Sequence, residues 1–156
     1  MKIRRAEEKD IPRIDELLNQ VLEIHAEIRP DIFISGTRKY TDDELKKILN
    51  DEKTPVFAAV DENDVLKGYA FCVMEDTSGS NNLVPQKSLY IDDLCVDEKA
   101  RGMHVGRILY DYVINYAKDE GCACVTLNVW EGNDSARAFY DKMGFTVRKT
   151  VMEKKL

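Results

Sequence analysis

The stretch DEKARGMHVGRILY, residues 97–110, joins a carboxylate-rich turn to apolar residues at helical spacing. Arg101, Gly102 and Gly106 stand at this joint. A helix that begins here presents unpaired amide groups and the positive end of its dipole, and glycine lets a ligand oxygen approach the backbone closely. The joint therefore suits a phosphate or pyrophosphate group. The alternative is that the glycines only permit a tight turn and close packing of a strand against the helix.

The residues around this joint predict alternating helices and strands. Helical spacing of apolar residues covers 11–25, 41–51, 105–121 and 134–144. Strand patterns cover 1–6, 88–96, 122–130 and 145–156, and two β-rich runs around a polar turn at 62–64 indicate a hairpin. Asp10 is the expected cap of the first helix. Thr41, with Glu44 at capping-box spacing, is that of the second, and Gly121 closes the third.

This order of elements predicts a single α+β domain over residues 1–156. We expect an α/β sandwich with a central mixed, mostly antiparallel sheet flanked by helices and a strand–helix–strand unit late in the chain. The hydrophobic content of 44 % suffices for one sizeable core. No apolar stretch approaches the roughly 20 residues of a membrane span, and the start lacks a secretory signal. We therefore expect a cytoplasmic protein without a membrane partner.

Charge and cysteine content argue against two further classes of protein. The net charge is −6, which disfavours a nucleic-acid partner held by its phosphates. Cys72, Cys95, Cys122 and Cys124 include no CxxC pair, so we expect neither a metal site nor a redox dithiol, but reduced thiols within strands. The chain also lacks the GK[ST] of a P-loop and a GxGxxG after its first strand.

Two motifs resemble the signatures of the GNAT superfamily of N-acetyltransferases. RGMHVG, residues 101–106, looks like the acyl-CoA signature Q/R-x-x-G-x-G/A, and NDSARAFYDKMGF, residues 133–145, looks like the second signature. They occur in the family's order with a strand between them. The resemblance implies a GNAT-like sheet with a splayed strand pair at the cofactor site. It also implies acetyl-CoA as cosubstrate without a metal, and direct acetyl transfer to a primary amine.

The resemblance also implies which residues bind acetyl-CoA. The backbone of Leu94 and Val96, at the exposed edge of the splayed strand, is expected to bind the pantetheine arm and the acetyl carbonyl. Asn133 is expected at the amide arm and Tyr140 near the sulfur. Alternatively, Asn133 only caps its helix and Tyr140 only belongs to the core. The pyrophosphate is expected against the main chain of Arg101, Gly102, Met103, His104, Val105, Gly106 and Arg107.

His104 departs from the family pattern, because it stands at the first glycine of the motif. If the backbone is left-handed there, histidine costs of order 1 kcal/mol relative to glycine. The simpler interpretation is that only the amide is used and the side chain points outward. The alternative is that a protonated imidazole lies beside the pyrophosphate.

The chemistry of amine acetylation suggests roles for three side chains. An ammonium must lose a proton before its nitrogen attacks, and the leaving thiolate needs a proton donor. Tyr140 suits the donor. Asp92 and Asp93 should face opposite sides of the sheet, and we expect Asp92 to hold the cation and pass its proton to ordered water. A solvated strand end is the alternative. Cys95 as an acetyl carrier is disfavoured, because no histidine or lysine neighbours it.

The acceptor is indicated by carboxylates. YIDDLCV, residues 90–96, resembles the corresponding strand of spermidine/spermine acetyltransferases, where adjacent carboxylates hold a polyamine. With Glu27 and Asp31, Asp92 and Asp93 would bind a small diamine or polyamine. A protein N-terminus or lysine is an alternative acceptor, and a non-catalytic acetyl-CoA-binding sensor or interaction module is an alternative class. The family resemblance also leads us to expect a homodimer.

Overall fold

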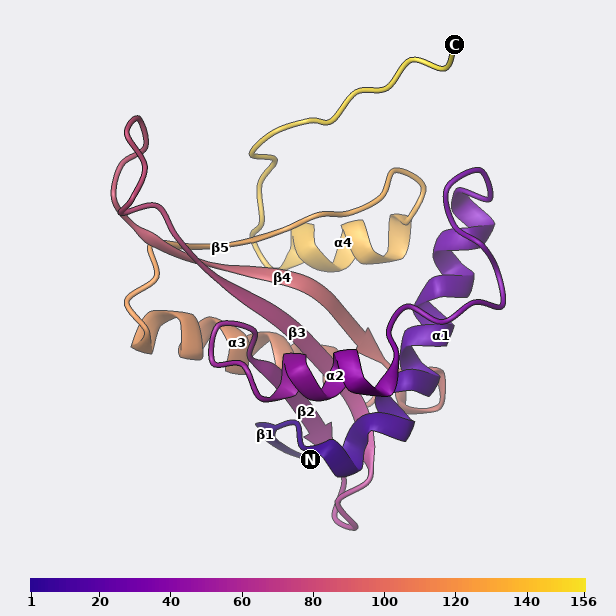
Figure 1. Cartoon of the computed structure of the whole chain (residues 1–156). Coiled ribbons are helices and arrows are strands. Elements are labelled where there is room, and N and C mark those ends of the chain that lie inside the picture. The colour runs from indigo at the N-terminus through magenta and orange to yellow at the C-terminus, as the bar shows by residue number, and fades with distance from the viewer.

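A five-stranded sheet with strand order β1-β2-β3-β4-β5 forms the centre of the computed structural model, which describes residues 1–156 (Figure 1). The first four strands pair antiparallel and β5 pairs parallel with β4, as the mixed sheet predicted from the sequence requires. The strands are β1 (Lys2–Arg5), β2 (Val56–Val60), β3 (Leu66–Asp76), β4 (Lys87–Val96) and β5 (Cys124–Leu127). The helices are α1 (Ile11–Ile28), α2 (Asp42–Leu49), α3 (Val105–Asp119) and α4 (Asp134–Lys142).

The sheet divides the core into two layers. On one face, α1 and α2 bury Ile14, Leu17 and Leu45 against Tyr69 of β3. On the other face, α3 packs on a cluster that includes Phe57 of β2. The helices expected from apolar spacing are therefore present because each buries one such face.

Gly68 of β3 lets α3 come close to the sheet. A Cβ atom at this position would lie 2.8 Å from the carbonyl oxygen of Cys95, 3.1 Å from Leu109 and 3.3 Å from Val105. The first of these distances is too short for any side chain, and the obstructing atom belongs to the backbone. Only glycine at residue 68 is compatible with the observed spacing between α3, β3 and β4.

Two local predictions are confirmed and a third is wrong. Thr41 and Glu44 form the capping box of α2, and Gly121, with φ +75°, follows the end of α3. Asp10 stands at the start of α1, but its carboxylate makes no capping hydrogen bond to that helix. It accepts instead from the Glu7 amide at 2.8 Å and from Arg4, because an ion pair to a guanidinium outweighs a cap.

The last predicted strand, residues 145–156, is not formed. The final backbone hydrogen bond of the chain is donated by the Phe145 amide to the Tyr140 carbonyl, and no later residue pairs with the sheet. Strand character alone does not form a strand, because the backbone groups also need the edge of a neighbouring strand to pair with. In Figure 1 the segment follows α4 as a coil, and it contacts the rest of the chain through side chains, among them Glu153, which pairs with Arg29 at 2.7 Å.

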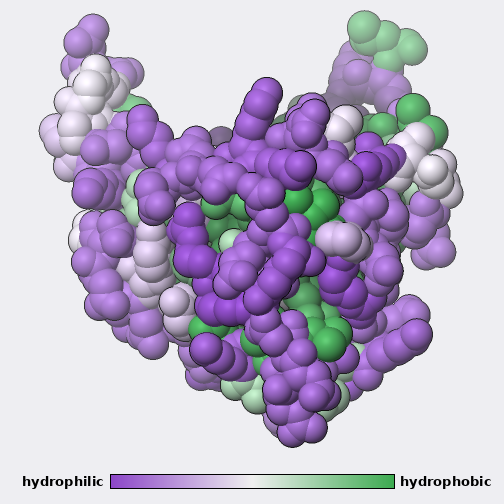
Figure 2. All heavy atoms as spheres, turned by 60° about the horizontal axis from the view of Figure 1, so that its bottom comes forward, coloured by the Kyte–Doolittle hydropathy of each residue, from purple (hydrophilic) through white to green (hydrophobic).

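The surface in Figure 2 is mostly hydrophilic, with hydrophobic atoms visible in a limited central region and at projecting segments. Among the helices, none combines the length and apolar character needed to span a bilayer.

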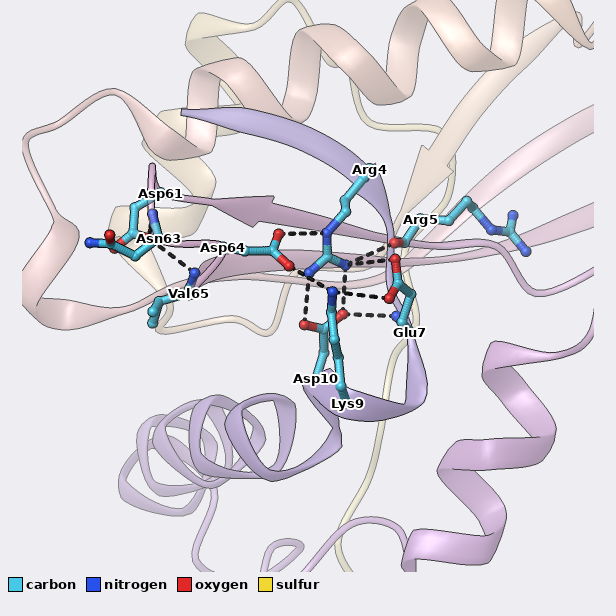
Figure 3. Close-up of polar contacts among 9 residues, drawn as sticks. All are labelled: Arg4, Arg5, Glu7, Lys9, Asp10, Asp61, Asn63, Asp64 and Val65. Atoms are coloured by element: carbon cyan, nitrogen blue, oxygen red, sulfur yellow. Dashed lines mark hydrogen bonds and ion pairs between the residues drawn. The ribbon is translucent and has the colours of Figure 1, made fainter.

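Figure 3 shows an ion-pair cluster that ties β1 to the start of α1 and to the β2–β3 turn. Arg4 donates two hydrogen bonds to the Asp10 carboxylate, at 2.7 and 3.0 Å, and one to Asp64 at 2.9 Å. The side chains of Arg4 and Asp10 are only 13 % and 5 % exposed. Lys9 reaches Asp64 at 2.6 Å from the solvent side. The cluster therefore contains one buried pair and one exposed pair, linked through Arg4 and Asp64.

Removing one member of the buried pair should destabilise the protein strongly. Asp10→Ala leaves the Arg4 guanidinium without its bidentate partner, and we expect the free energy of unfolding to fall by about 3 kcal/mol in urea denaturation. The matched control is Lys9→Ala in the exposed pair, which should change stability little because solvent screens it. Equal decreases in the free energy of unfolding for the two substitutions would show that burial does not increase the contribution of the Arg4–Asp10 pair to stability.

Candidate active site

Strands β4 and β5 separate halfway along β4. The pairing of β4 with β5 ends at Ile91 opposite Leu127, whereas pairing with β3 continues to Val96 opposite Gly68. Residues 92–96 of β4 therefore have one edge without a strand partner. Leu94 and Val96 lie on this free edge, so their backbone groups are available to a ligand.

Beyond the free edge, the chain turns into α3 through residues 101–104. Gly102 (φ +82°) and His104 (φ +58°) both adopt left-handed conformations. The amide groups of Gly102 and of residues 104–107 donate to no protein acceptor. Arg101 is exposed and has no ion-pair partner, whereas Arg107 is paired with Asp111 at 2.8 Å. A row of free amides at a helix N-terminus, beside one unpaired guanidinium, fits an anionic group such as a pyrophosphate.

Gly106, in the first turn of α3, lies beside this row of free amides. A Cβ atom there would lie 3.6 Å from Val96 and 3.8 Å from Phe139 of α4, at ordinary contact distance. The first turn of α3 is thus close to both the free edge of β4 and α4. The strand edge followed by the free amides fits an extended ligand with an amide-bearing arm and a pyrophosphate, as in coenzyme A.

A β-bulge at Asp92 changes the direction in which the next side chain, Asp93, points. Phe71 of β3 lies opposite Asp93, and Cys72 lies opposite Ile91, so Asp92 has no partner across the ladder. Ile91 belongs to the core layer under α3, whereas Cys95 belongs to the layer under α1. The extra residue therefore reverses the alternation of faces along β4.

Because of the bulge, the prediction that Asp92 and Asp93 face opposite sides is wrong. Lys39, from the loop between α1 and α2, places its Nζ 3.1 Å from Asp92 Oδ2. Burial lowers the pKa of Lys39, but the charges of Asp92, Asp93 and Tyr40 and the hydrogen bond to Asp92 raise it overall. Both carboxylates thus act on one ammonium group.

The surroundings of Asp93 shift the pKa of its carboxyl group toward neutrality. Burial raises its pKa to about 6, although the charge of Lys39 and a hydrogen bond from Tyr69 oppose this shift. The Tyr69 hydroxyl donates to Asp93 Oδ2 at 2.9 Å, and its ring is fully buried. A carboxylate with a pKa near neutrality that is held in place by a buried phenol is suited to accept a proton.

Tyr140 lies on α4, near enough to Asp93 for the charge of that carboxylate to act on its hydroxyl. Burial raises the pKa of its hydroxyl, and the charge of Asp93 raises it further. Its ring packs against Phe139 and Phe145 at centroid distances of 5.3 and 5.5 Å. The hydroxyl therefore stays protonated at neutral pH and is able to donate a proton.

The remaining predicted residues lie in differing surroundings. Asn133 caps α4, accepting from the Ala136 amide at 3.4 Å. Glu27 is exposed on α1, and Asp31 is paired with Arg29 at 2.7 Å and with Lys155 at 3.4 Å. Burial raises the pKa of the Cys95 thiol to about 12, which makes it a poor nucleophile.

Sequence reasoning missed Lys39 and Tyr69 as members of the site. Tyr69 lies across the antiparallel ladder from Cys95, two positions along β4 from Asp93, so strand register contains a signal for it. No periodic pattern relates Lys39 to Asp92, which lies 53 residues away in the sequence.

The chain is similar to acetyltransferases of several kinds. The profile of the acetyltransferase (GNAT) family matches residues 18–145. The 5-NmdU N-acetyltransferase of Pseudomonas phage PaMx11 is 28 % identical over 130 residues, covering 80 % of this chain and 82 % of that protein. The peptidyl-lysine N-acetyltransferase YjaB of Escherichia coli K12 is 32 % identical over 95 residues, covering 61 % and 52 %. A mutant BH1408 protein from Bacillus halodurans has a TM-score of 0.94 at 33 % identity, covering 100 % and 99 %.

The fold and the site together define an acyl-CoA-dependent transferase. The chain belongs to the acetyltransferase (GNAT) family and is an N-acetyltransferase, for which the family's cosubstrate is acetyl-CoA.

Because the backbone at His104 is left-handed, we expect the protein to be more stable with glycine at this position. His104→Gly should raise the free energy of unfolding by about 1 kcal/mol in urea denaturation, because glycine adopts this conformation without steric cost. Gly102→Ala, the matched control at the other left-handed position, should lower it. If only the amide of residue 104 binds the pyrophosphate, acetyl-CoA affinity measured by calorimetry is unchanged in His104→Gly. A large loss of affinity would show that the imidazole takes part.

Proposed function

We propose that the enzyme transfers an acetyl group directly from acetyl-CoA to the primary amine of a small cationic acceptor, such as a diamine or polyamine. The observation that carries this proposal is the alkylammonium of Lys39 held at Asp92 and Asp93. A group of the same chemistry as the acceptor thus already occupies this position. The cytoplasmic location stays a prediction.

Acetyl-CoA supplies an activated acetyl thioester when it is bound. We assign the pantetheine arm and acetyl carbonyl to the backbone of Leu94 and Val96, and the amide arm also to Asn133 beyond its capping role. The pyrophosphate is assigned to residues 101–107, chiefly through their free amides. This assignment is supported by the unpaired edge of β4 and by the amides without protein acceptors.

We assign the proton-accepting role to Asp93 instead of Asp92. Asp93 is the better base because its pKa of about 6 is closer to neutrality than that of an unperturbed aspartate. Asp92, at the bulge and nearer solvent, is assigned to holding the acceptor cation. Tyr140 donates a proton to the leaving sulfur, because its hydroxyl stays protonated at neutral pH.

The outer carboxylates contribute less to this proposal. Arg29 and Lys155 already offset the charge of Asp31, and Glu27 is exposed to solvent that screens its charge. We therefore keep Glu27 and Asp31 only as an outer rim of the acceptor site. Selectivity for a cation then depends mainly on Asp92.

The pH dependence of catalysis should report the ionisation of Asp93. Below pH about 6 the carboxylate becomes protonated and is lost as a base, so kcat/KM should fall more steeply there than the ionisation of the amine alone requires. This fall appears as a break in the pH profile of kcat/KM. Asp93→Asn should lower kcat/KM by roughly 10²-fold or more and abolish the break. Tyr140→Phe should lower kcat at every pH without moving the break. A break that persists in Asp93→Asn would exclude Asp93 as the base.

An acceptor panel tests the cation site. Asp92→Asn should raise KM for a diamine about 10-fold, since removal of an ion-pair partner is worth about 1.4 kcal/mol, but change KM little for a monoamine that has no second cationic group. Lys39→Met, which keeps the aliphatic stem and removes the competing ammonium, should lower KM for the diamine.

The panel also includes lysine peptides, because a similar protein is a peptidyl-lysine N-acetyltransferase. The proposal is wrong in its substrate class if a lysine peptide or an acidic amine is preferred over diamines. It is wrong about Asp92 if Asp92→Asn affects all amines equally. Free thiol release measured for each acceptor distinguishes these results.

A further inference from the structure

Lys39 places a primary amine of the chain itself at the candidate acceptor site. Its Nζ lies 3.1 Å from Asp92 Oδ2, and the charge of Asp93 also acts on it. The two aspartates come directly before Leu94, on the unpaired edge of β4 to which the acetyl carbonyl is assigned. No other lysine of the chain pairs with a carboxylate of β4. One internal amine therefore lies next to the strand edge proposed for the acetyl group.

The loop that carries Lys39 is held to the helices on both sides of the lysine. Arg38 Nε lies 2.7 Å from Asp15 Oδ1 of α1. Thr41, two residues after Lys39, caps α2 and forms a capping box with Glu44. These contacts restrict the backbone at residue 39 and leave the flexible four-carbon side chain as the part that can move.

Tyr40 helps to hold the lysine beside the carboxylates. The Tyr40 ring stacks on Phe71 of β3, with a centroid distance of 6.2 Å and an interplanar angle of 18°. Phe71 lies opposite Asp93 across the β3–β4 ladder. Lys39 Nζ lies 5.1 Å from the centre of the Tyr40 ring, which is a cation–π distance. The position of Lys39 is thus determined by the packing of its neighbours on the sheet.

The groups assigned to proton transfer lie around the same amine. The charges of Lys39 and Asp93 act on each other, and the charge of Asp93 also acts on the Tyr140 hydroxyl. Asp92 is the only carboxylate within ion-pair distance of Lys39 Nζ, so a proton would reach Asp93 through one water molecule. The amine, the base and the proton donor thus form one cluster.

We propose that Lys39 is a modification site, which the enzyme acetylates on its own chain when acetyl-CoA is bound and no free amine fills the acceptor site. Lys39 Nζ gives one proton to Asp93, which releases it to solvent. The lone pair of Nζ then attacks the acetyl carbonyl carbon, so that a C–N bond forms and the C–S bond breaks. Tyr140 gives its proton to the leaving sulfur and takes up the second proton that Nζ loses. The products are an amide at Lys39 and free CoA.

This inference rests on the proposed function, because it uses the same base, proton donor and acceptor position. An acetylated lysine is a neutral amide, so modification removes the ion pair between Lys39 and Asp92. The pKa of Asp93 then rises, because the charge of Lys39 holds it down. A diamine that binds at Asp92 displaces Lys39 and should protect it from acetylation.

The test is the mass of the purified chain, measured before and after incubation with acetyl-CoA in the absence of any amine. One acetyl group per chain should be incorporated, and peptide mapping should place it on Lys39. The rate should not depend on protein concentration, because the lysine lies in the site of its own chain. Tyr140→Phe should slow the incorporation by roughly 10²-fold.

Two lysine variants provide the comparison. Lys39→Arg keeps the positive charge beside Asp92 and should abolish the incorporation. Lys9→Arg is the matched control, because Lys9 is also ion-paired, to Asp64 at 2.6 Å, but lies away from the site. It should leave the incorporation unchanged.

Acetic anhydride separates catalysis from simple reactivity, because it acetylates amines without a cofactor site. It should prefer a lysine such as Lys155, whose side chain is 75 % exposed, to Lys39, whose side chain is 41 % exposed. Selective modification of Lys39 by the anhydride as well would show that the lysine is merely reactive and would overturn the proposal. A rate with acetyl-CoA that rises with protein concentration would overturn it too.

The acetylation of Lys39 and that of a free diamine can fail separately. If the diamine is acetylated but Lys39 stays unmodified without it, the proposal for Lys39 is wrong and the proposed function stands. If Lys39 is acetylated but the diamine neither reacts nor protects it, the proposal for Lys39 stands and the proposed substrate class is wrong.

Discussion

The active site depends on one extra residue in β4. Asp92 has no partner across the β3–β4 ladder, and pairing between β4 and β5 stops at the residue before it. A bulge bends its strand and strengthens the local twist, so the bulge and the separation of the strands belong together. The separation leaves residues 92–96 with an unpaired edge, where we propose that acetyl-CoA binds, and the reversed alternation turns Asp93 toward Tyr69. In the proposed mechanism, cofactor binding and proton transfer therefore both depend on this single irregularity of the sheet.

The sequence predicted those parts of the fold that arise from local patterns. The capping box at Thr41, the glycine after α3 and the strand–helix–strand unit each depend on residues close together in the chain. The bulge at Asp92 was not predictable from periodicity, because two adjacent aspartates are polar on either face. The position of Lys39 against Asp92 depends on how a loop folds over the sheet, and no local rule describes that.

The structure also differs from the sequence-based predictions at Asp10 and at residues 145–156, and in both cases contacts between distant parts of the chain are the reason. Asp10 has the residue type and position of a cap, but Arg4, held nearby on β1, provides a stronger partner. Residues 145–156 have strand character, but strand character does not say which edge a strand joins. In both cases the local preference was correctly identified, and the partner was determined by the tertiary arrangement.

The missing side chain at Gly68 has a consequence for ligand binding as well as for packing. Its neighbours are the carbonyl of Cys95 on β4 and Val105 at the first turn of α3. The contact therefore fixes the distance between the strand edge and the helix terminus, the two surfaces that a single extended cofactor must span. A larger residue at position 68 would increase the distance between the free edge of β4 and the N-terminus of α3. If acetyl-CoA binds as proposed, such a change would alter its affinity through the spacing of the two surfaces.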